Sequence, residues 1–210
     1  MSHGVHAVQH EAEHRIEHVD GDGEGHGKGS ENRNKKIALV IAVIALFLAF
    51  SETLGKSAQT AALSYNIEAS NLWAFFQAKT IRRTLVETAA QAMALEANAA
   101  QIEAIKAAMT KQVDFWQKAG ARYRSEPETR EGSVELMERA KEAEHKRDTA
   151  MARYHHYEVA SAAFQIGIVL ASSAVITGMI ALVWLSGGLA VVGLGFMAIG
   201  LLAPHAVHLM

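Results

Sequence analysis

The stretch Ile37–Phe50 reads IALVIAVIALFLAF, and its composition decides which solvent this chain is built for. It holds no polar or charged side chain, and Arg33, Lys35 and Lys36 stand directly before it. The strictly apolar run is short for a membrane span, but including residues 51–55 brings it to roughly the twenty residues that a span needs. A cleaved signal peptide is the alternative, but the segment that precedes the run is too long for a usual leader. We therefore predict an uncleaved transmembrane helix over residues 35–55.

A second apolar block fills most of Ala162–Ala203. It is long enough for two spans, which we predict over residues 161–185 and 188–204, with a turn at Ser186–Gly187–Gly188. Gly167 and Ala171 have the spacing of small residues that lets membrane helices approach closely. Together with the first run, this block predicts three transmembrane helices.

Between the two apolar blocks the pattern is helical and rich in alanine and charge. Apolar residues return at a spacing of three or four, and Ile102, Ile105, Met109 and Trp116 fit a heptad seam that Gln112 interrupts. Gly120 ends that periodicity. Ser125 and Glu128 have the spacing of a capping box around Pro127, which suits the first turn of a new helix. We predict a soluble hairpin over residues 56–160, with helices at 66–119 and 126–160.

The predicted fold is thus an all-α membrane protein. Three transmembrane helices carry a long antiparallel, coiled-coil-like hairpin between the first and the second. The apolar stripe on the second hairpin helix is thin, so we expect that another copy of the chain could complete it.

Residues 1–34 form a tail rich in histidine and glycine, which favours a disordered segment. An alternative is a transition-metal site, because four histidines recur every fourth residue and would share one face of a helix: His6, His10, His14 and His18. A calcium-binding loop starting at Asp20 is disfavoured, because Gly27 and Lys28 occupy positions where such a loop needs an apolar residue and no added positive charge. No other cofactor is expected.

The most individual stretch is Ala69–Arg82, which reads ASNLWAFFQAKTIR. It resembles an element of a bacterial membrane-protein family catalogued as domain of unknown function 4337, in which W-x-x-F/Y-Q-A-K-x-x-R follows a first membrane segment. The resemblance covers roughly residues 30 to 205. It implies a first span, a charged helical middle and an apolar C-terminal pair, but no activity, substrate or cofactor.

The same element has two physical interpretations. Aromatic residues beside cations suit a helix that lies on a membrane surface. The favoured interpretation is that the aromatic residues pack against the returning helix. The polar members could contact a partner, so the candidate interaction residues are Trp73, Phe76, Gln77, Lys79 and Arg82.

Several function classes find little support. The net charge of −2 gives no electrostatic case for nucleic acid. The absence of cysteine excludes disulfides and thiol nucleophiles. We find no Ser/His/Asp set, phosphate-binding glycine loop or pair of buried carboxylates, so an enzyme is not expected.

The sequence therefore predicts a structural or interaction protein of the bacterial inner membrane. Its partners would be the lipid bilayer, a second copy of the chain or an unidentified protein. The alternatives are metal handling by the histidine tail and an oligomeric ion pathway that involves Glu52. Cations near the spans are balanced between the two sides, so the first helix favours a cytoplasmic tail and an external hairpin, with a cytoplasmic hairpin as the alternative.

Overall fold

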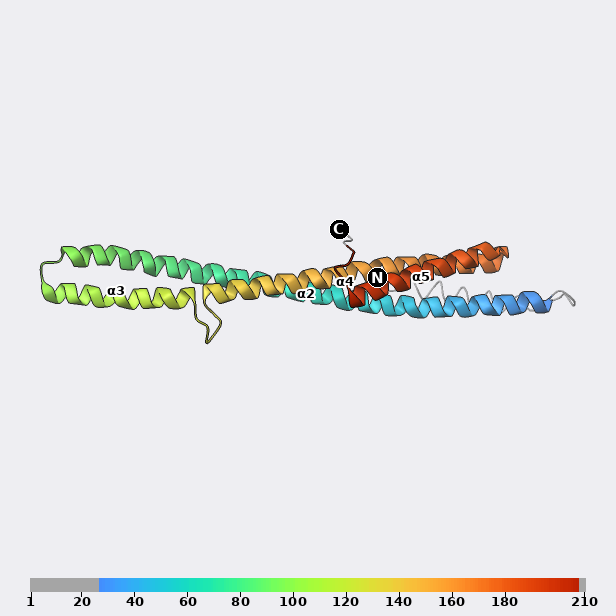
Figure 1. Cartoon of the computed structure of the whole chain (residues 1–210), viewed down its shortest axis with the longest axis horizontal. Helices are drawn as coiled ribbons and strands as arrows, with labels where there is room; N and C mark the ends of the chain where they lie inside the picture. The colour runs from blue at the N-terminus through green and yellow to red at the C-terminus, as the bar shows by residue number, and fades with distance from the viewer. Residues whose placement is uncertain (1–26, 208–210) are drawn as a thin grey trace.

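The computed structural model describes residues 27–207, with side chains from Asn32 onward, and this part of the chain forms α-helices and no strand. The helices are α2 (Gly27–Ala99), α3 (Glu103–Arg124), α4 (Ser133–Thr177) and α5 (Ile180–Leu202). Figure 1 shows an elongated molecule with α2 along almost its whole length. Helices α3 and α4 follow one another back along α2, and α5 lies beside the end of α4. The predicted all-α class is confirmed.

Helix α2 is uninterrupted for 73 residues, which corresponds to about 110 Å. The sequence predicts one helix that ends near residue 55 and another that begins near 66, whereas the structure joins the two. The joining segment is helical because its small residues fit closely against α4. Ser51, Ala58 and Ala62 are buried there, and the Ser51 hydroxyl donates to the backbone carbonyl of Tyr157 at 2.9 Å.

The chain reverses at residues 100–102, and the predicted reversal at Gly120–Glu126 is wrong. Gly120 lies inside α3, where it is buried against Val86 and Glu87 of α2. A glycine in this position permits a close approach of two helices rather than a turn. Helices α3 and α4 each pack along α2 and barely touch one another, so the antiparallel hairpin pairs α2 with both.

Residues 125–132 link α3 to α4, and Ser125 caps the end of α3 instead of starting a new helix. The Ser125 hydroxyl donates to the carboxylate of Glu135, and the Glu126 backbone N–H donates to the same carboxylate at 3.3 Å. The Ser133 hydroxyl donates to the Arg124 carbonyl at 3.2 Å. The first turn of α4 is thereby tied to the last turn of α3.

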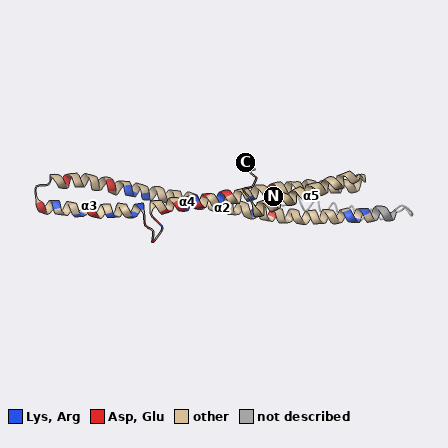
Figure 2. Ribbon diagram, in the orientation of Figure 1, with Lys and Arg blue, Asp and Glu red and all other residues tan. Residues whose placement is uncertain are grey.

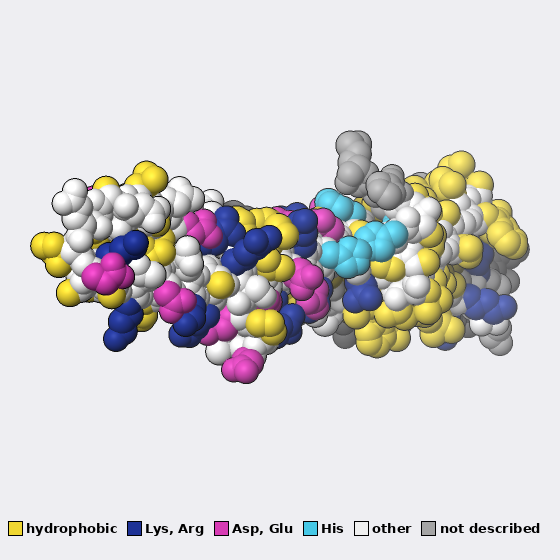
Figure 3. Space-filling view, turned by 60° about the vertical axis from the view of Figure 1, so that its left-hand side comes forward, with side chains coloured by type: hydrophobic (Ala, Val, Ile, Leu, Met, Phe, Trp, Pro, Cys, Tyr) yellow, Lys and Arg dark blue, Asp and Glu magenta, His cyan; other side chains and the backbone are white. Residues whose placement is uncertain are grey.

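The first part of α2, the second part of α4 and all of α5 form an apolar three-helix bundle. Ile44, Ala160 and Phe164 are its buried centre, and Phe47 stacks on Phe164 with ring centroids 6.2 Å apart. Within the described residues, three helices are long and apolar enough to cross a membrane, judged by length and composition: α2, α4 and α5. Figure 3 shows hydrophobic side chains gathered over this end of the molecule.

The turn between the last two helices lies at Gly178–Met179 and not at the predicted Ser186–Gly188. Gly178 has a φ of 70°, the left-handed conformation that ends many helices and that glycine adopts without strain. Ser186 is buried within α5 and donates to the Gly167 carbonyl at 2.7 Å. The predicted helix bounds 161–185 and 188–204 are replaced by Ser133–Thr177 and Ile180–Leu202.

Close packing in the bundle predicts different effects of the same change at two glycines of α5. A Cβ at Gly193 would lie 2.7 Å from the buried Phe164 ring, whereas a Cβ at Gly195 would meet nothing within 4 Å. Gly193→Ala should therefore lower the unfolding temperature of the purified protein, by an overpacking cost of roughly 1–3 kcal/mol. Gly195→Ala is the matched control, since both changes gain the same helix propensity. Equal melting temperatures for the two variants would refute this packing.

Candidate functional site

The Ala69–Arg82 element lies on α2 at the level where α3 ends and α4 begins. We call the contacts of this element with residues 122–144 the joint. At this level the helix that packs against α2 changes from α4 to α3. The two halves of the joint differ in the polarity of their side chains. One half is apolar and holds α4, and the other is charged and holds α3 with the linker.

The apolar half of the joint is a small core between α2 and α4. Buried Leu72 packs with Leu136, and Trp73 and Phe76 cover them. The two aromatic rings meet edge to face with centroids 5.4 Å apart, and the indole N–H of Trp73 donates to a carboxylate oxygen of Glu144 at 2.9 Å. Edge-to-face pairs and satisfied indole donors both favour one fixed arrangement. The aromatic residues of the element therefore position the start of α4.

The charged half of the joint is centred on Lys79, which is only 7% exposed. Its ammonium lies 3.9 Å from a Glu126 carboxylate oxygen and 3.8 Å from one of Glu131. It also lies 5.4 Å from the ring centroid of Phe75 and 5.7 Å from that of Tyr123. A buried ammonium needs such compensation from carboxylates and aromatic faces. Lys79 thus connects α2 to the end of α3 and to both ends of the linker.

Two carboxylates beside Lys79 and Ser125 have lowered pKa values: Glu126 in the linker and Glu135 in the first turn of α4. The hydrogen bond from Arg122 lowers the pKa of Glu126, and the hydrogen bond from the Ser125 hydroxyl lowers the pKa of Glu135. The Arg122–Glu126 ion pair measures 2.7 Å. These groups connect the end of α3, the linker and the start of α4.

The structure separates the five candidate interaction residues into two groups. Trp73, Phe76 and Lys79 come together in the joint, whereas Gln77 and Arg82 are exposed and take no part in it. Lys79 contacts Glu126 and Glu131, and Trp73 contacts Glu144. These three partners were not predicted, because charged residues so far along the chain give no local signal of contact. The one local signal that could have found part of this contact is that Lys79 follows Phe75 by four residues, the spacing that brings two side chains together on a helix.

The other candidate sites lie elsewhere. His6, His10, His14 and His18 are outside the described residues. Between Asn32 and Val207 no group of three or more histidine, aspartate and glutamate side chains could hold a metal ion. Glu52 accepts a hydrogen bond from the Gln165 amide at 3.2 Å and lines a crevice of about 320 Å³ with Glu158.

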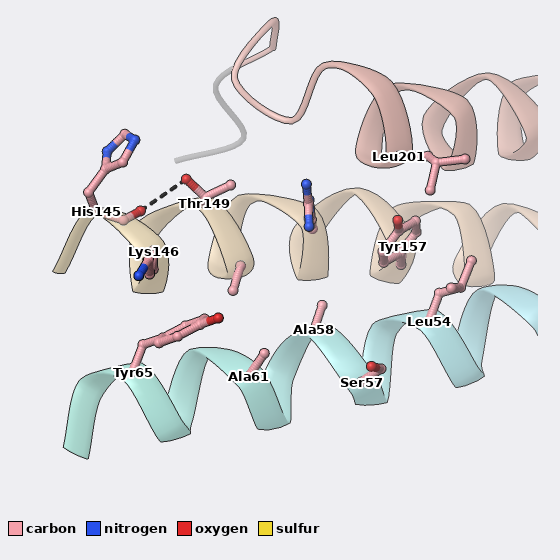
Figure 4. A pocket seen from close by; sticks show the side chains of 12 residues that line it. Leu54, Ser57, Ala58, Ala61, Tyr65, His145, Lys146, Thr149, Tyr157 and Leu201 are labelled. Atoms are coloured by element: carbon pink, nitrogen blue, oxygen red, sulfur yellow. Dashed lines mark hydrogen bonds between the residues drawn. The ribbon is translucent and has the colours of Figure 1, made fainter. Parts of the chain in front are cut away.

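Figure 4 shows a larger pocket, of about 370 Å³, between α2 and α4 beside Leu201 of α5. Lys146 and Arg153 line it, but no carboxylate does. The Thr149 hydroxyl donates to the His145 carbonyl at 2.9 Å and lies 3.1 Å from His205 Nε2. These contacts fasten the residues after α5 onto α4, and they assemble no nucleophile, base and acid together.

The burial of Lys79 predicts that it stabilises the joint. Lys79→Met keeps the apolar stem but removes the ammonium from between two carboxylates, and should destabilise the protein by roughly 1–3 kcal/mol, between the values for surface and buried pairs. The matched control is Arg82→Met, three residues along α2 and exposed. Thermal unfolding of both variants would be compared, and a loss of stability as large for the control would remove this role from Lys79.

The lowered pKa values predict that acid loosens the linker. A carboxylate with a lowered pKa in the folded state adds stability above its ordinary value of about 4.5, and this stability is lost as the pH falls through the lowered value. The hydrogen-exchange protection factor of the Glu126 amide should therefore fall between pH 7 and pH 3. In Glu135→Gln it should be lower at pH 7 and less dependent on pH. Protection that does not change with pH in the wild-type protein would contradict this.

The geometry can be compared with known proteins. A search of the curated proteins and of the solved structures finds no match to this chain. A family model described as domain of unknown function 4337 matches residues 33–203, which cover all of α3, α4 and α5 and nearly all of α2. The match includes the joint and the apolar bundle together. The chain therefore belongs to the family of domain of unknown function 4337.

Proposed function

We propose that this protein is a multi-pass protein of the bacterial inner membrane that holds a helical hairpin at a fixed height above the bilayer. It would act as a structural spacer and interaction surface, without catalysis. The observation that carries this proposal is the continuity of α2 from the apolar bundle into the hairpin. Because no loop separates the two parts, the bundle fixes the direction of the hairpin.

The dimensions of the apolar bundle suit a bilayer. Helix α5 has 23 residues and is about 35 Å long, close to a hydrocarbon thickness of about 30 Å. Figure 2 shows cations at the start of α2, at the end of the molecule where α4 turns into α5. At the other end, Lys56 and Arg153 line the crevices that border the bundle. Large apolar side chains point outward between these limits, among them Leu39, Val169 and Val191.

The hairpin extends far beyond this bundle. From Lys56 to Ala99, α2 continues for about 65 Å at the helical rise per residue. Over that distance α4 and then α3 brace it, and the joint closes the gap where one replaces the other. Lys, Arg, Asp and Glu residues are distributed along this part of the molecule (Figure 2), as a surface in water requires. The positive-inside rule favours an external hairpin through the first helix, and a reporter fused near Ala99 would decide its side.

Fluorescence energy transfer to a lipid-bound acceptor would test the height of the hairpin. The chain has no cysteine, so a single dye can be attached through Asn98→Cys at the tip or Lys56→Cys at the border of the bundle. In vesicles, the dye at Lys56→Cys should transfer strongly and the dye at Asn98→Cys weakly, since they differ by about 65 Å in height. Equally strong transfer from both positions would show a hairpin lying on the membrane and would overturn the proposal.

A further inference from the structure

Helix α2 carries two heptad seams on opposite faces. The packed seam faces the other helices, and each of its positions is buried or half-buried: Ile37, Ile41, Ile44, Leu48, Ser51, Gly55, Ala58, Ala62, Tyr65, Ala69, Leu72, Phe76, Lys79, Arg83, Val86, Ala90, Met93 and Ala97. The open seam is displaced from it by two residues, about 200° around the helix. Every position of the open seam is exposed and none is charged: Leu39, Val43, Leu46, Phe50, Thr53, Ser57, Thr60, Ser64, Ile67, Asn71, Ala74, Ala78, Ile81, Leu85, Thr88, Ala92, Leu95 and Ala99.

Toward the tip of the hairpin, two leucines lie on the open seam while two positions of the packed seam are alanine. Ala90 and Ala97 are buried against α3, at 2% and 4% exposure. Leu85 and Leu95 on the open seam are exposed at 68% and 73%. A helix that had only α3 to pack against would place leucine inward and alanine outward. The distribution indicates that the open seam is also an interface.

Lipid does not account for this part of the seam. In the proposed arrangement the bilayer covers Leu39 to Phe50, and the border lies near Lys56. Ile67, Ile81 and Leu95 are well beyond it, in water. An uncharged row in which large exposed apolar side chains recur there, with alanine, serine, threonine and asparagine between them, is the pattern of a protein contact.

We propose that a second copy of this chain covers the open seam, with the two α2 helices side by side and parallel around a two-fold axis along the rod. This inference rests on the proposed function, because membrane anchoring gives both copies the same direction and the same height. Each residue of the seam then meets its own counterpart, as an isologous contact requires. A spacing of 3.5 residues maintained from Leu39 to Ala99 is the repeat of a left-handed two-stranded coil.

The size of the seam is sufficient for a stable dimer. From Leu39 to Ala99 it is about 90 Å long, and a helix is about 10 Å wide, so the strip covers roughly 900 Å² on each chain. Stable interfaces bury about 800 Å² on each partner. Helices α3 and α4 lie against the opposite face of α2 and do not obstruct this contact.

Charges beside the seam are compatible with a parallel pair. Each heptad of such a coil has two seam positions. The residue just before the first of them lies opposite the partner's residue five places further along, which is the one just after the second. Each flanking charge then faces a neutral residue on the second copy: Lys56 faces Ala61, Glu68 faces Leu63, Arg82 faces Gln77 and Glu96 faces Gln91. No like charges are opposed, and Gln77 and Arg82, the two candidate interaction residues that take no part in the joint, come together between the copies.

Oxidative cross-linking of single cysteines in native membranes tests this contact. Leu85→Cys and Leu95→Cys lie on the seam, where a symmetric contact brings the two cysteines within disulfide range. Lys111→Cys is the matched control, because it is exposed on α3 at about the height of Leu95. We expect at least roughly tenfold more covalent dimer from the seam positions than from the control. Equal yields from all three positions would indicate random collision and would overturn the proposal.

A charge on the seam tests the same contact without oxidation. Leu85→Glu with Leu95→Glu should convert a dimer into a monomer in detergent, as measured by light scattering coupled to size exclusion. The helix content should not change, because both side chains are exposed in the single chain. Lys111→Glu should stay dimeric.

A wild-type protein that is monomeric in membranes, but whose dye at Asn98→Cys still transfers weakly to the lipid acceptor, would overturn the dimer alone. A tip close to the bilayer would overturn the proposed function.

Discussion

The structure depends on one constraint, which is that α2 stays helical across the change from apolar to charged sequence. The end of α4 packs along it at the apolar end, the start of α4 in the middle and α3 at the tip, while α5 packs mainly on α4. Small residues make this possible where the helices cross the boundary, since Ser51, Gly55 and Ala58 bring α4 close. Because an isolated helix is only marginally stable, the length of α2 reflects these neighbours more than its own propensity.

The joint closes the gap that this arrangement of helices leaves along α2. Two consecutive helices on the same side of α2 leave a gap between them, and the linker that spans it would otherwise be unsupported. Lys79 fills the gap from α2 and draws Glu126 and Glu131 toward it, while Trp73 fixes α4 through Glu144. The Ala69–Arg82 element, which lies within the family match, is therefore the part that lets α3 and α4 follow one another along α2. Its exposed residues remain available for contact with a second chain.

The sequence was sufficient for the fold class and for the apolar ends, because a run such as Ile37–Phe50 has few alternatives. It was insufficient for the turns. Heptad periodicity continues to the reversal at 100–102, so no local signal marks it. The glycines were poor markers of turns: Gly120 and Ser186–Gly188 lie inside helices, and among residues 27–207 only Gly178 stands directly after the last residue of a helix. The joint could not be assembled in advance, since Lys79 and Glu126 meet only after the chain has reversed.

Electron–electron double resonance between two spin labels on α2 tests the central claim most directly. Labels at Gln59→Cys and Asn98→Cys, both exposed, lie 39 residues apart in sequence along one helix. In protein diluted with unlabelled chains, an unbroken α2 predicts one narrow distribution centred at about 58 Å. A broad distribution, or a distance much shorter than this, would mean that α2 bends between the bundle and the hairpin. The hairpin would then have no fixed height above the bilayer, which would contradict both the continuity of α2 and the function that depends on it.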